Sequence, residues 1–296
     1  MDIRIFVGAH QTTSHSMTHI LQQNAELLGQ QGISYCSDAP LAVRQINATL
    51  KSITDGHDPQ KAAQSLVQQL SGDQNSKRLL IVNPDIIGAA TKPFDTELFY
   101  PQVDKLIQQL RNAFIGFDLK IFAATNNPAS FIPASYSKSL MSAIFDPFQE
   151  YIDGADIQGY RWSSFIQRIQ HDDRNHLTVW RTEDYNYIWR DVLQAFTGIA
   201  NGQDFIGTSQ HENTGLSLEG AQLMQRYILE NPPRTKQGFD KTKTVFLERF
   251  PNSADALTGT DWSADLVQEL TDLYADDWYY IERMNNVTTI QPRNFD

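Results

Sequence analysis

Residues 3–16 read Ile-Arg-Ile-Phe-Val-Gly-Ala-His-Gln-Thr-Thr-Ser-His-Ser, a nearly continuous apolar run followed by a turn rich in hydroxyl side chains. The run from Ile3 to Val7 predicts a strand that is covered on both faces, as in the centre of a parallel sheet. The turn after Gly8 predicts a tight connection into a helix. Such a connection points several backbone N–H groups and the positive end of a helix at one place. The stretch therefore predicts a site for a phosphate or sulfate group.

The composition is that of an ordinary globular protein, with 296 residues, 41% of them hydrophobic and 20% charged. The formal net charge of −11 argues against general binding to nucleic acid, which requires a basic surface. Cys36 is the single cysteine, so no disulfide can form within the chain. The sequence has neither a leader-like start nor an apolar run of about 20 residues, and we expect a cytoplasmic protein.

Strand-like and helix-like segments alternate up to about residue 200. Further strands are expected at 33–35, 79–82, 119–124 and 176–181, and helices at 14–31, 40–54, 59–71, 100–115, 128–152 and 184–196. This alternation predicts an α/β fold with a mainly parallel sheet of four or five strands and helices on both faces. After about residue 210 we expect only helices, at 216–231, 240–249, 263–273 and 275–284. We interpret the chain as one domain, with an α/β core over residues 1–200 and a helical cap over residues 210–296.

The order of these segments resembles the sulfotransferase family, in particular its bacterial branch. Gly8-Ala9-His10-Gln11-Thr12-Thr13 is similar to the family's opening motif, Gly-x-His-Lys-Thr-Gly-Thr-Thr. Four later segments resemble further family motifs in the same order, namely residues 83–88, 125–136, 180–184 and 273–277. The resemblance implies the P-loop-like sulfotransferase fold. It also implies 3′-phosphoadenosine 5′-phosphosulfate as the sulfuryl donor.

The resemblance implies two contact regions for this donor. It places the 5′-phosphosulfate group on the first loop, at Gly8, Gln11, Thr12, Thr13, Ser14 and His15. It places the 3′-phosphate near Asn126 and either Ala134 or Ser135, and a basic loop with Arg234 and Lys236 could add positive charge there.

The chain departs from the family at the donor contacts that matter most. Gln11 stands where the family has lysine, Thr13 where it has glycine, Asn126 where it has arginine, and Ala134 where it has serine, with Ser135 one place away. A neutral amide gives a hydrogen bond about half as strong as a charged donor. Losing one preorganised donor of this kind typically costs about 10²–10³ in rate. The departures therefore indicate either a weakened donor site or a different ligand.

The candidate catalytic residues are His10, Gln11 and Asp85. His10 and Gln11 lie in the loop itself, and Asp85 is the nearest carboxylate at a strand end that could accept a proton. No metal is expected. The run from His171 to His176 contains metal-capable side chains, but it has the character of an exposed turn between a helix and a strand.

Three functions stay open at this point. The first is transfer of a sulfuryl group from 3′-phosphoadenosine 5′-phosphosulfate to a hydroxyl of a carbohydrate or other small molecule. The second is a non-catalytic binding or scaffold protein that retains the sulfotransferase fold and has lost the donor site. The third is a transferase with a less charged donor, in which His10 acts as an acid or base. We expect a small-molecule or carbohydrate partner, with no nucleic acid and no membrane, and the oligomeric state stays open.

Overall fold

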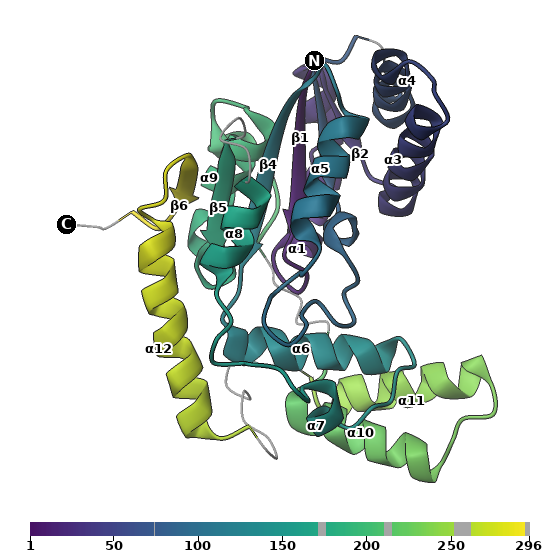
Figure 1. Cartoon of the computed structure of the whole chain (residues 1–296), viewed down its shortest axis with the longest axis vertical. Helices are drawn as coiled ribbons and strands as arrows, with labels where there is room; N and C mark the ends of the chain where they lie inside the picture. Colours follow the sequence, from purple (N-terminus) through teal and green to yellow (C-terminus); the bar gives the residue numbers. More distant parts are fainter. Residues whose placement is uncertain (74, 171–175, 210–214, 252–261, 294–296) are drawn as a thin grey trace.

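The first strand, β1 (Asp2–Gly8), lies inside a six-stranded sheet with the order β2-β3-β1-β4-β5-β6 (Figure 1). The computed structural model describes residues 1–73, 75–170, 176–209, 215–251 and 262–293. The other strands are β2 (Ile33–Cys36), β3 (Arg78–Val82), β4 (Asp118–Thr125), β5 (Leu177–Arg181) and β6 (Val287–Ile290). Every strand pair in the described residues is parallel. The predicted α/β class with a mainly parallel sheet is therefore confirmed.

Side chains of the central strands alternate between two apolar layers. Ile3, Ile5 and Val7 point into one layer, and Phe6 points into the other. The first layer is covered by α3 (Ala39–Thr54), α4 (Pro59–Ser71), α5 (Val103–Ala113) and α8 (Trp162–Gln170). The second layer is covered by α1 (Ser14–Gln23), α2 (Ala25–Gln30) and α9 (Tyr185–Thr197). Both faces of the sheet are thus buried, as the apolar strands predict.

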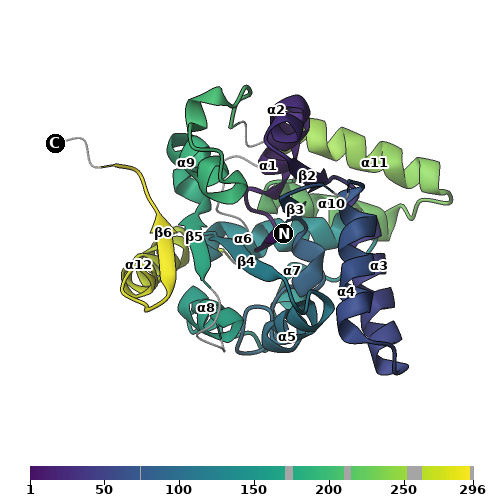
Figure 2. The same ribbon diagram turned by 90° about the horizontal axis from the view of Figure 1, so that it is seen from above.

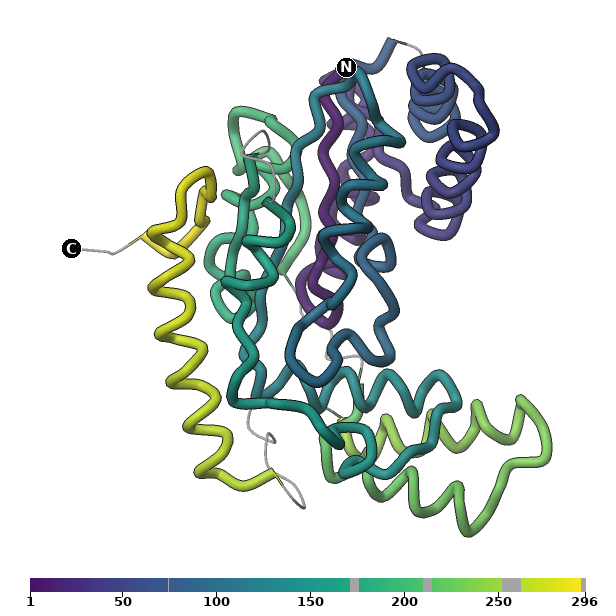
Figure 3. The backbone as a smooth tube through the Cα atoms, in the orientation of Figure 1, coloured from purple at the N-terminus to yellow at the C-terminus, as the bar shows by residue number. Residues whose placement is uncertain are grey.

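Further helices lie beyond the carboxyl ends of the strands (Figures 1 and 3). They are α6 (Pro128–Met141), α7 (Phe148–Tyr151), α10 (Leu218–Glu230) and α11 (Lys236–Arg249). Short 3₁₀ turns follow three of the elements, at η1 (Pro84–Ile87), η2 (Thr182–Asp184) and η3 (Gly202–Asp204). The end-on view in Figure 2 shows α12 (Ala264–Ile281) and β6 at the edge of the sheet next to β5.

Four predictions of local structure need correction. The sheet has six strands, because β6 follows the last helix and pairs with β5. The helices expected at 263–273 and 275–284 are one continuous helix, α12. The expected helix 14–31 is broken at Asn24, whose amide donates to the carbonyls of Ile20 and Ile206, both at 2.8 Å. The region 128–152 holds two separate helices, α6 and α7.

An ion cluster fixes the opposite end of the sheet. Arg4 and Arg78 both contact the carboxylate of Asp2, at 2.9 Å and 2.7 Å. The guanidinium of Arg4 also donates to the carbonyl of Ala195 at 2.7 Å, and Arg78 donates to the carbonyl of Thr197. These are the last carbonyls of α9, where positive charge is stabilising.

Candidate functional site

The loop between β1 and α1 lies at the carboxyl edge of the sheet, where ligands of open parallel sheets bind. β1 has β3 on one side and β4 on the other. The chain leaves β1 toward β2, at one end of the sheet, and leaves β4 toward β5, in the other direction. Residues 8–16 therefore lie at a change of winding direction, which is the usual place for a crevice.

Gly8 turns the chain out of the strand. Its φ is +115°, a conformation that side chains rarely permit, and an added Cβ would lie 3.2 Å from the Cβ of Pro84. The next residue, Ala9, donates its backbone N–H to the carbonyl of Ala124 at 2.8 Å, which ties the loop to β4. The glycine is required both for its backbone angle and for the close packing of η1.

His10 is buried and uses its backbone and both ring nitrogens. Its backbone N–H donates to the hydroxyl of Tyr100 at 2.8 Å, and its Nδ1 lies 2.9 Å from the same hydroxyl. Its Nε2 lies 3.1 Å from Oδ1 of Asp85. A carboxylate only accepts, so Nε2 carries the proton, and Nδ1 accepts the hydroxyl proton of Tyr100. This arrangement gives a partner to both ring nitrogens of His10 and to the hydroxyl of Tyr100.

Asp85 belongs to η1, and most of its side chain is exposed, at 67%. The hydrogen bond from His10 holds the pKa of this carboxyl below its usual value, against the effect of partial burial, and Lys138 on α6 adds to the lowering. The carboxylate is therefore ionised at neutral pH. The sequence-based candidates His10 and Asp85 do meet in the structure, and the geometry makes Asp85 the exposed end of the pair.

Asn126, at the end of β4, fixes the middle of the loop. Its amide donates to the carbonyl of Gln11 at 3.0 Å, and its side-chain oxygen accepts from Ser130 at 2.9 Å. Gln11 itself has a positive φ of 53°. Both ends of the Asn126 side chain are thus engaged within the protein. Gln11 is half-buried.

The start of α1 has an unusual cap. Thr13 is its N-cap residue, yet its side chain makes no cap hydrogen bond. The hydroxyl points instead into the core, where it donates to the sulfur of Met17 and accepts from the indole of Trp180 at 3.2 Å. The hydroxyl of Thr12 donates back to the carbonyl of Ala9 at 2.6 Å. The first N–H groups of a helix have no intrahelical acceptor, and the side chain of Thr13 does not cap them here. Ser14 and His15 begin this turn, Ser14 half-buried and His15 exposed.

Among the residues expected at the 3′-phosphate, Asn126 contacts the loop, whereas Ser135 lies on α6 and Arg234 and Lys236 lie at the start of α11. Ser135 is fully buried on α6. Arg234 and Lys236 flank Thr235, the N-cap of α11, and α11 has no buried residue. Figure 1 shows α11 against α10, on the far side of α6 from the sheet. Within the described ranges, residues 8–14 make no hydrogen bond or ion pair with a lysine or arginine.

A second group of polar residues was not expected as a unit. Glu183 accepts from the backbone N–H of Asn127 at 2.6 Å and from the hydroxyl of Tyr274 at 3.2 Å. That hydroxyl also lies 2.7 Å from the hydroxyl of Thr125. The contacts join α12 to the ends of β4 and β5. Arg181, at the end of β5, forms an ion pair with Asp184 at 2.8 Å.

Tyr100 is a further member of the site that could not be predicted from the sequence. It lies in an irregular segment before α5, is buried and has a positive φ of 49°. Arg168 on α8 donates to its carbonyl at 2.6 Å. Nothing in a lone tyrosine followed by proline predicts a contact with a loop 90 positions earlier.

The described part of the chain holds no cluster of metal ligands and no membrane-spanning helix. In those residues no group of three or more His, Cys, Asp or Glu side chains is arranged to hold a metal ion. Residues 171–175, which contain most of the metal-capable run, lie outside the described residues. The described helices include none that is both long and apolar enough to pass through a bilayer.

Comparisons with known proteins complete the description of the site. No family model and no curated protein sequence matches the chain. Among solved structures, a sulfotransferase from Alicyclobacillus acidocaldarius is similar, with a TM-score of 0.38 and 12% sequence identity. The match covers 87% of this chain and 98% of that one. At this level of similarity the comparison carries no argument about function, which must come from the residues described above.

Proposed function

We propose that the chain is a sulfotransferase-like protein whose β1–α1 loop binds the 5′-phosphosulfate group of 3′-phosphoadenosine 5′-phosphosulfate. The group transferred is a sulfuryl group, and the acceptor is a hydroxyl of a carbohydrate or other small molecule. The observation that carries the proposal is the start of α1, where the N-cap side chain of Thr13 turns into the core. The first turn of α1 therefore lies at the carboxyl edge of the sheet without a side-chain cap from its N-cap residue.

The helix end supplies the attraction for the anion. The N-terminus of a helix carries a partial positive charge, and N–H groups there bind phosphate or sulfate. The loop in front of it is fixed at three points, by Ala124, Tyr100 and Asn126. A fixed loop loses little conformational freedom on binding, which favours affinity.

The side chains divide into binding and proton-handling roles. The proposed anion loop consists of Gly8, Gln11, Thr12, Thr13, Ser14 and His15. Asp85, ionised and exposed, is the better candidate for accepting the acceptor's proton. Both ring nitrogens of His10 are already hydrogen-bonded, so His10 positions Asp85. The third reading, with His10 as acid or base toward a less charged donor, is disfavoured for the same reason.

Calorimetry with 3′-phosphoadenosine 5′-phosphate tests this proposal directly. We expect binding at micromolar to millimolar ligand and no binding of adenosine, which has the same base and ribose without the phosphates. A missing cation weakens the site, since hydrogen bonds to charged groups contribute about 1.5–3 kcal/mol each. Absence of heat at millimolar nucleotide would contradict the proposal.

A second candidate, a non-catalytic protein of the same architecture, is favoured by one specific observation. Asn126, which stands at the family's arginine position, is used at both ends of its side chain to hold the loop. Replacing it by arginine would break that support, so Gln11→Lys alone is the cleaner variant. If Gln11→Lys raises nucleotide affinity, the site is weakened but intact. If the nucleotide affinity stays the same, the pocket has been remodelled. Sulfate transfer by the natural chain would exclude the non-catalytic candidate.

A further inference from the structure

A groove between α3 and α5 ends at the same aspartate that contacts the loop. It has a volume of about 120 Å³. Its walls are mostly aliphatic side chains of α3, η1 and α5, namely Val43, Ile46, Leu50, Ile86, Leu106 and Leu110. Four of these side chains are only half-buried, so apolar surface remains open to solvent. The polar lining consists of Asn47, Gln109 and Asp85.

Asp85 is the point where this groove and the loop meet. It lines the groove, and its Oδ1 accepts the hydrogen bond from His10 at 3.1 Å. η1, the turn that carries Asp85, also packs on the start of the loop, because Pro84 and Ile87 lie beside Gly8. A molecule in the groove therefore has one end next to the carboxylate and close to the anion loop.

We propose that this groove is the acceptor site, and that it holds the apolar body of a small aliphatic alcohol whose hydroxyl hydrogen-bonds to Asp85. The proposal rests on the function proposed above and narrows its acceptor class. In the transfer step the alcohol oxygen forms a bond to sulfur while the bond from sulfur to the bridging phosphate oxygen breaks. The hydroxyl proton moves to Asp85, and 3′-phosphoadenosine 5′-phosphate leaves with the electron pair.

The lining favours an apolar body over a sugar. Burying aliphatic surface against Leu50 and Leu106 is favourable in proportion to the area removed from water. A sugar would bring several hydroxyls into a groove with three polar side chains, and each hydroxyl without a partner costs free energy. The positive charge of Lys138 also lowers the pKa of Asp85. The ionised carboxylate can therefore accept a hydrogen bond from the hydroxyl of a neutral alcohol.

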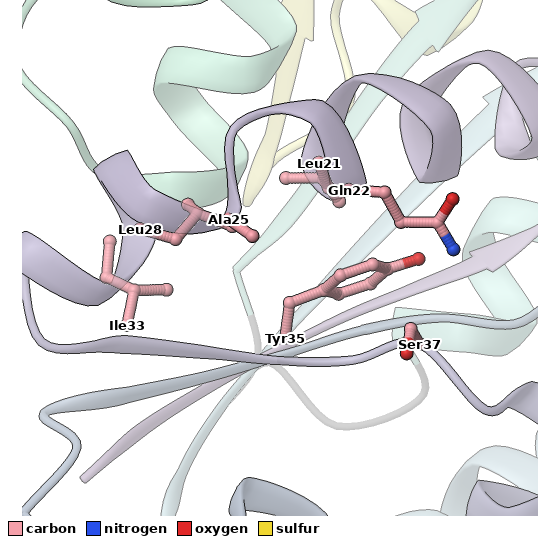
Figure 4. A pocket seen from close by; sticks show the side chains of 7 residues that line it. All are labelled: Leu21, Gln22, Ala25, Leu28, Ile33, Tyr35 and Ser37. Atoms are coloured by element: carbon pink, nitrogen blue, oxygen red, sulfur yellow. The ribbon is translucent and has the colours of Figure 1, made fainter.

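The test uses methyl NMR of the natural chain with 1-hexanol as probe and no nucleotide present. We expect shifts at the methyl groups of Leu50, Ile86 and Leu106. The chain offers an internal control in a second hollow of about 210 Å³ between α1, α2 and β2, shown in Figure 4. Leu28 and Ile33 line this hollow. Shifts confined to these two residues, or equal shifts with glucose as probe, would overturn the assignment.

Two variants locate the probe within the groove. Leu106→Trp fills the groove and is expected to abolish the shifts at Leu50. Asp85→Ala removes the carboxylate that accepts the hydrogen bond of the alcohol. We expect this variant, at an exposed position, to weaken hexanol binding about fivefold. Hexanol binding that is unchanged in either variant would overturn the proposal.

The donor is measured separately, so that the two proposals can fail separately. Calorimetry of Leu106→Trp with 3′-phosphoadenosine 5′-phosphate should give the affinity of the natural chain, because Leu106 is not part of the loop. If the natural chain binds no nucleotide while hexanol occupies the groove, the donor assignment fails and the alcohol site stands. If nucleotide binds and hexanol does not reach the groove, only the acceptor assignment fails.

Discussion

Nε2 of His10 lies 3.1 Å from Oδ1 of Asp85, so one hydrogen bond joins the loop after β1 to the turn after β3. A histidine in this position would be expected to exchange protons with a substrate. Here its two ring nitrogens are engaged by Tyr100 and Asp85. His10 therefore positions the side chain of Asp85, and the exposed carboxylate of Asp85 is the group that can accept a proton.

The first prediction concerns Tyr100→Phe, which removes one hydroxyl and keeps the ring. The backbone N–H and Nδ1 of His10 then lose their partner. Two lost hydrogen bonds of this kind cost about 1–3 kcal/mol, so affinity for 3′-phosphoadenosine 5′-phosphate should fall about tenfold or more. The nitrogen NMR signal of Nδ1 of His10 should also shift, because Nδ1 loses the hydroxyl that donates to it, while Asp85 keeps the proton on Nε2.

Tyr151→Phe is the matched control for this variant. Tyr151 is also buried, and its hydroxyl donates to the carbonyl of Thr91 at 2.9 Å. We expect this variant to lower thermal stability and leave both the nucleotide affinity and the Nδ1 signal of His10 unchanged. Equal losses of affinity in the two variants would show that Tyr100 acts only through general stability.

The second prediction compares two glycines that both have a positive φ. Gly8→Ala adds a Cβ that meets Pro84 at 3.2 Å, whereas Gly56→Ala at φ +93° meets nothing within 4 Å. The backbone angle alone costs about 1–3 kcal/mol in either variant. Urea unfolding should show a larger loss for Gly8→Ala, and only this variant should lose nucleotide binding. A similar effect of both variants on binding would argue against a role for the geometry at Gly8.

The third prediction is a pH dependence of stability that comes from Asp2. Burial alone would raise the pKa of this carboxyl, but hydrogen bonds from Arg4 and Arg78 outweigh it and hold the pKa below its usual value. A carboxyl with a lowered pKa in the folded state contributes stability above its unfolded pKa. That contribution is lost as pH falls through the folded pKa.

Asp2→Asn tests this sign. At pH 7 it should lower the free energy of unfolding by about 3 kcal/mol, because two partly buried guanidinium groups lose their carboxylate. The difference between the variant and the natural chain should shrink as the pH falls from about 5 toward 2. A difference that stays constant over this range in urea unfolding would contradict the ion cluster as its source.

The fourth prediction is the pH profile of sulfate transfer. If Asp85 accepts the proton, the base stays ionised at all pH values well above its lowered pKa. The rate should then be flat from about pH 5 to pH 8, the range in which an ordinary histidine titrates. An inflection inside this range that disappears in His10→Gln would assign the proton transfer to His10 and contradict the role given to Asp85.

The periodic, apolar parts of the fold could be predicted from sequence. The strands β1, β3, β4 and β5 are buried runs, and the helices expected at 40–54 and 59–71 are α3 and α4. β6 could not be predicted, because Val287 to Ile290 is a short, partly exposed edge strand whose pairing with β5 is set by tertiary contacts. Asn24 breaks the first helix through a contact with Ile206, which is equally invisible along the chain.

The candidate site divides in the same way. The loop was located from its strand, glycine and hydroxyls, which are local features. The meeting of His10 with Asp85 follows from the neighbouring positions of β1 and β3 in the sheet. Tyr100 and the groove at Leu106 depend on an irregular segment and on helix packing, and no local pattern encodes either of them.

The late position of β6 has a consequence for how the chain acquires its structure. β5 is synthesised long before its outer partner, with α10, α11 and α12 in between. Until β6 arrives, the backbone N–H and C=O groups on that side of β5 have no strand beside them, and such an edge readily joins another chain. We expect ribosome-bound intermediates that lack β6 to be prone to aggregation, and to lose this tendency once the last parallel pairing has formed.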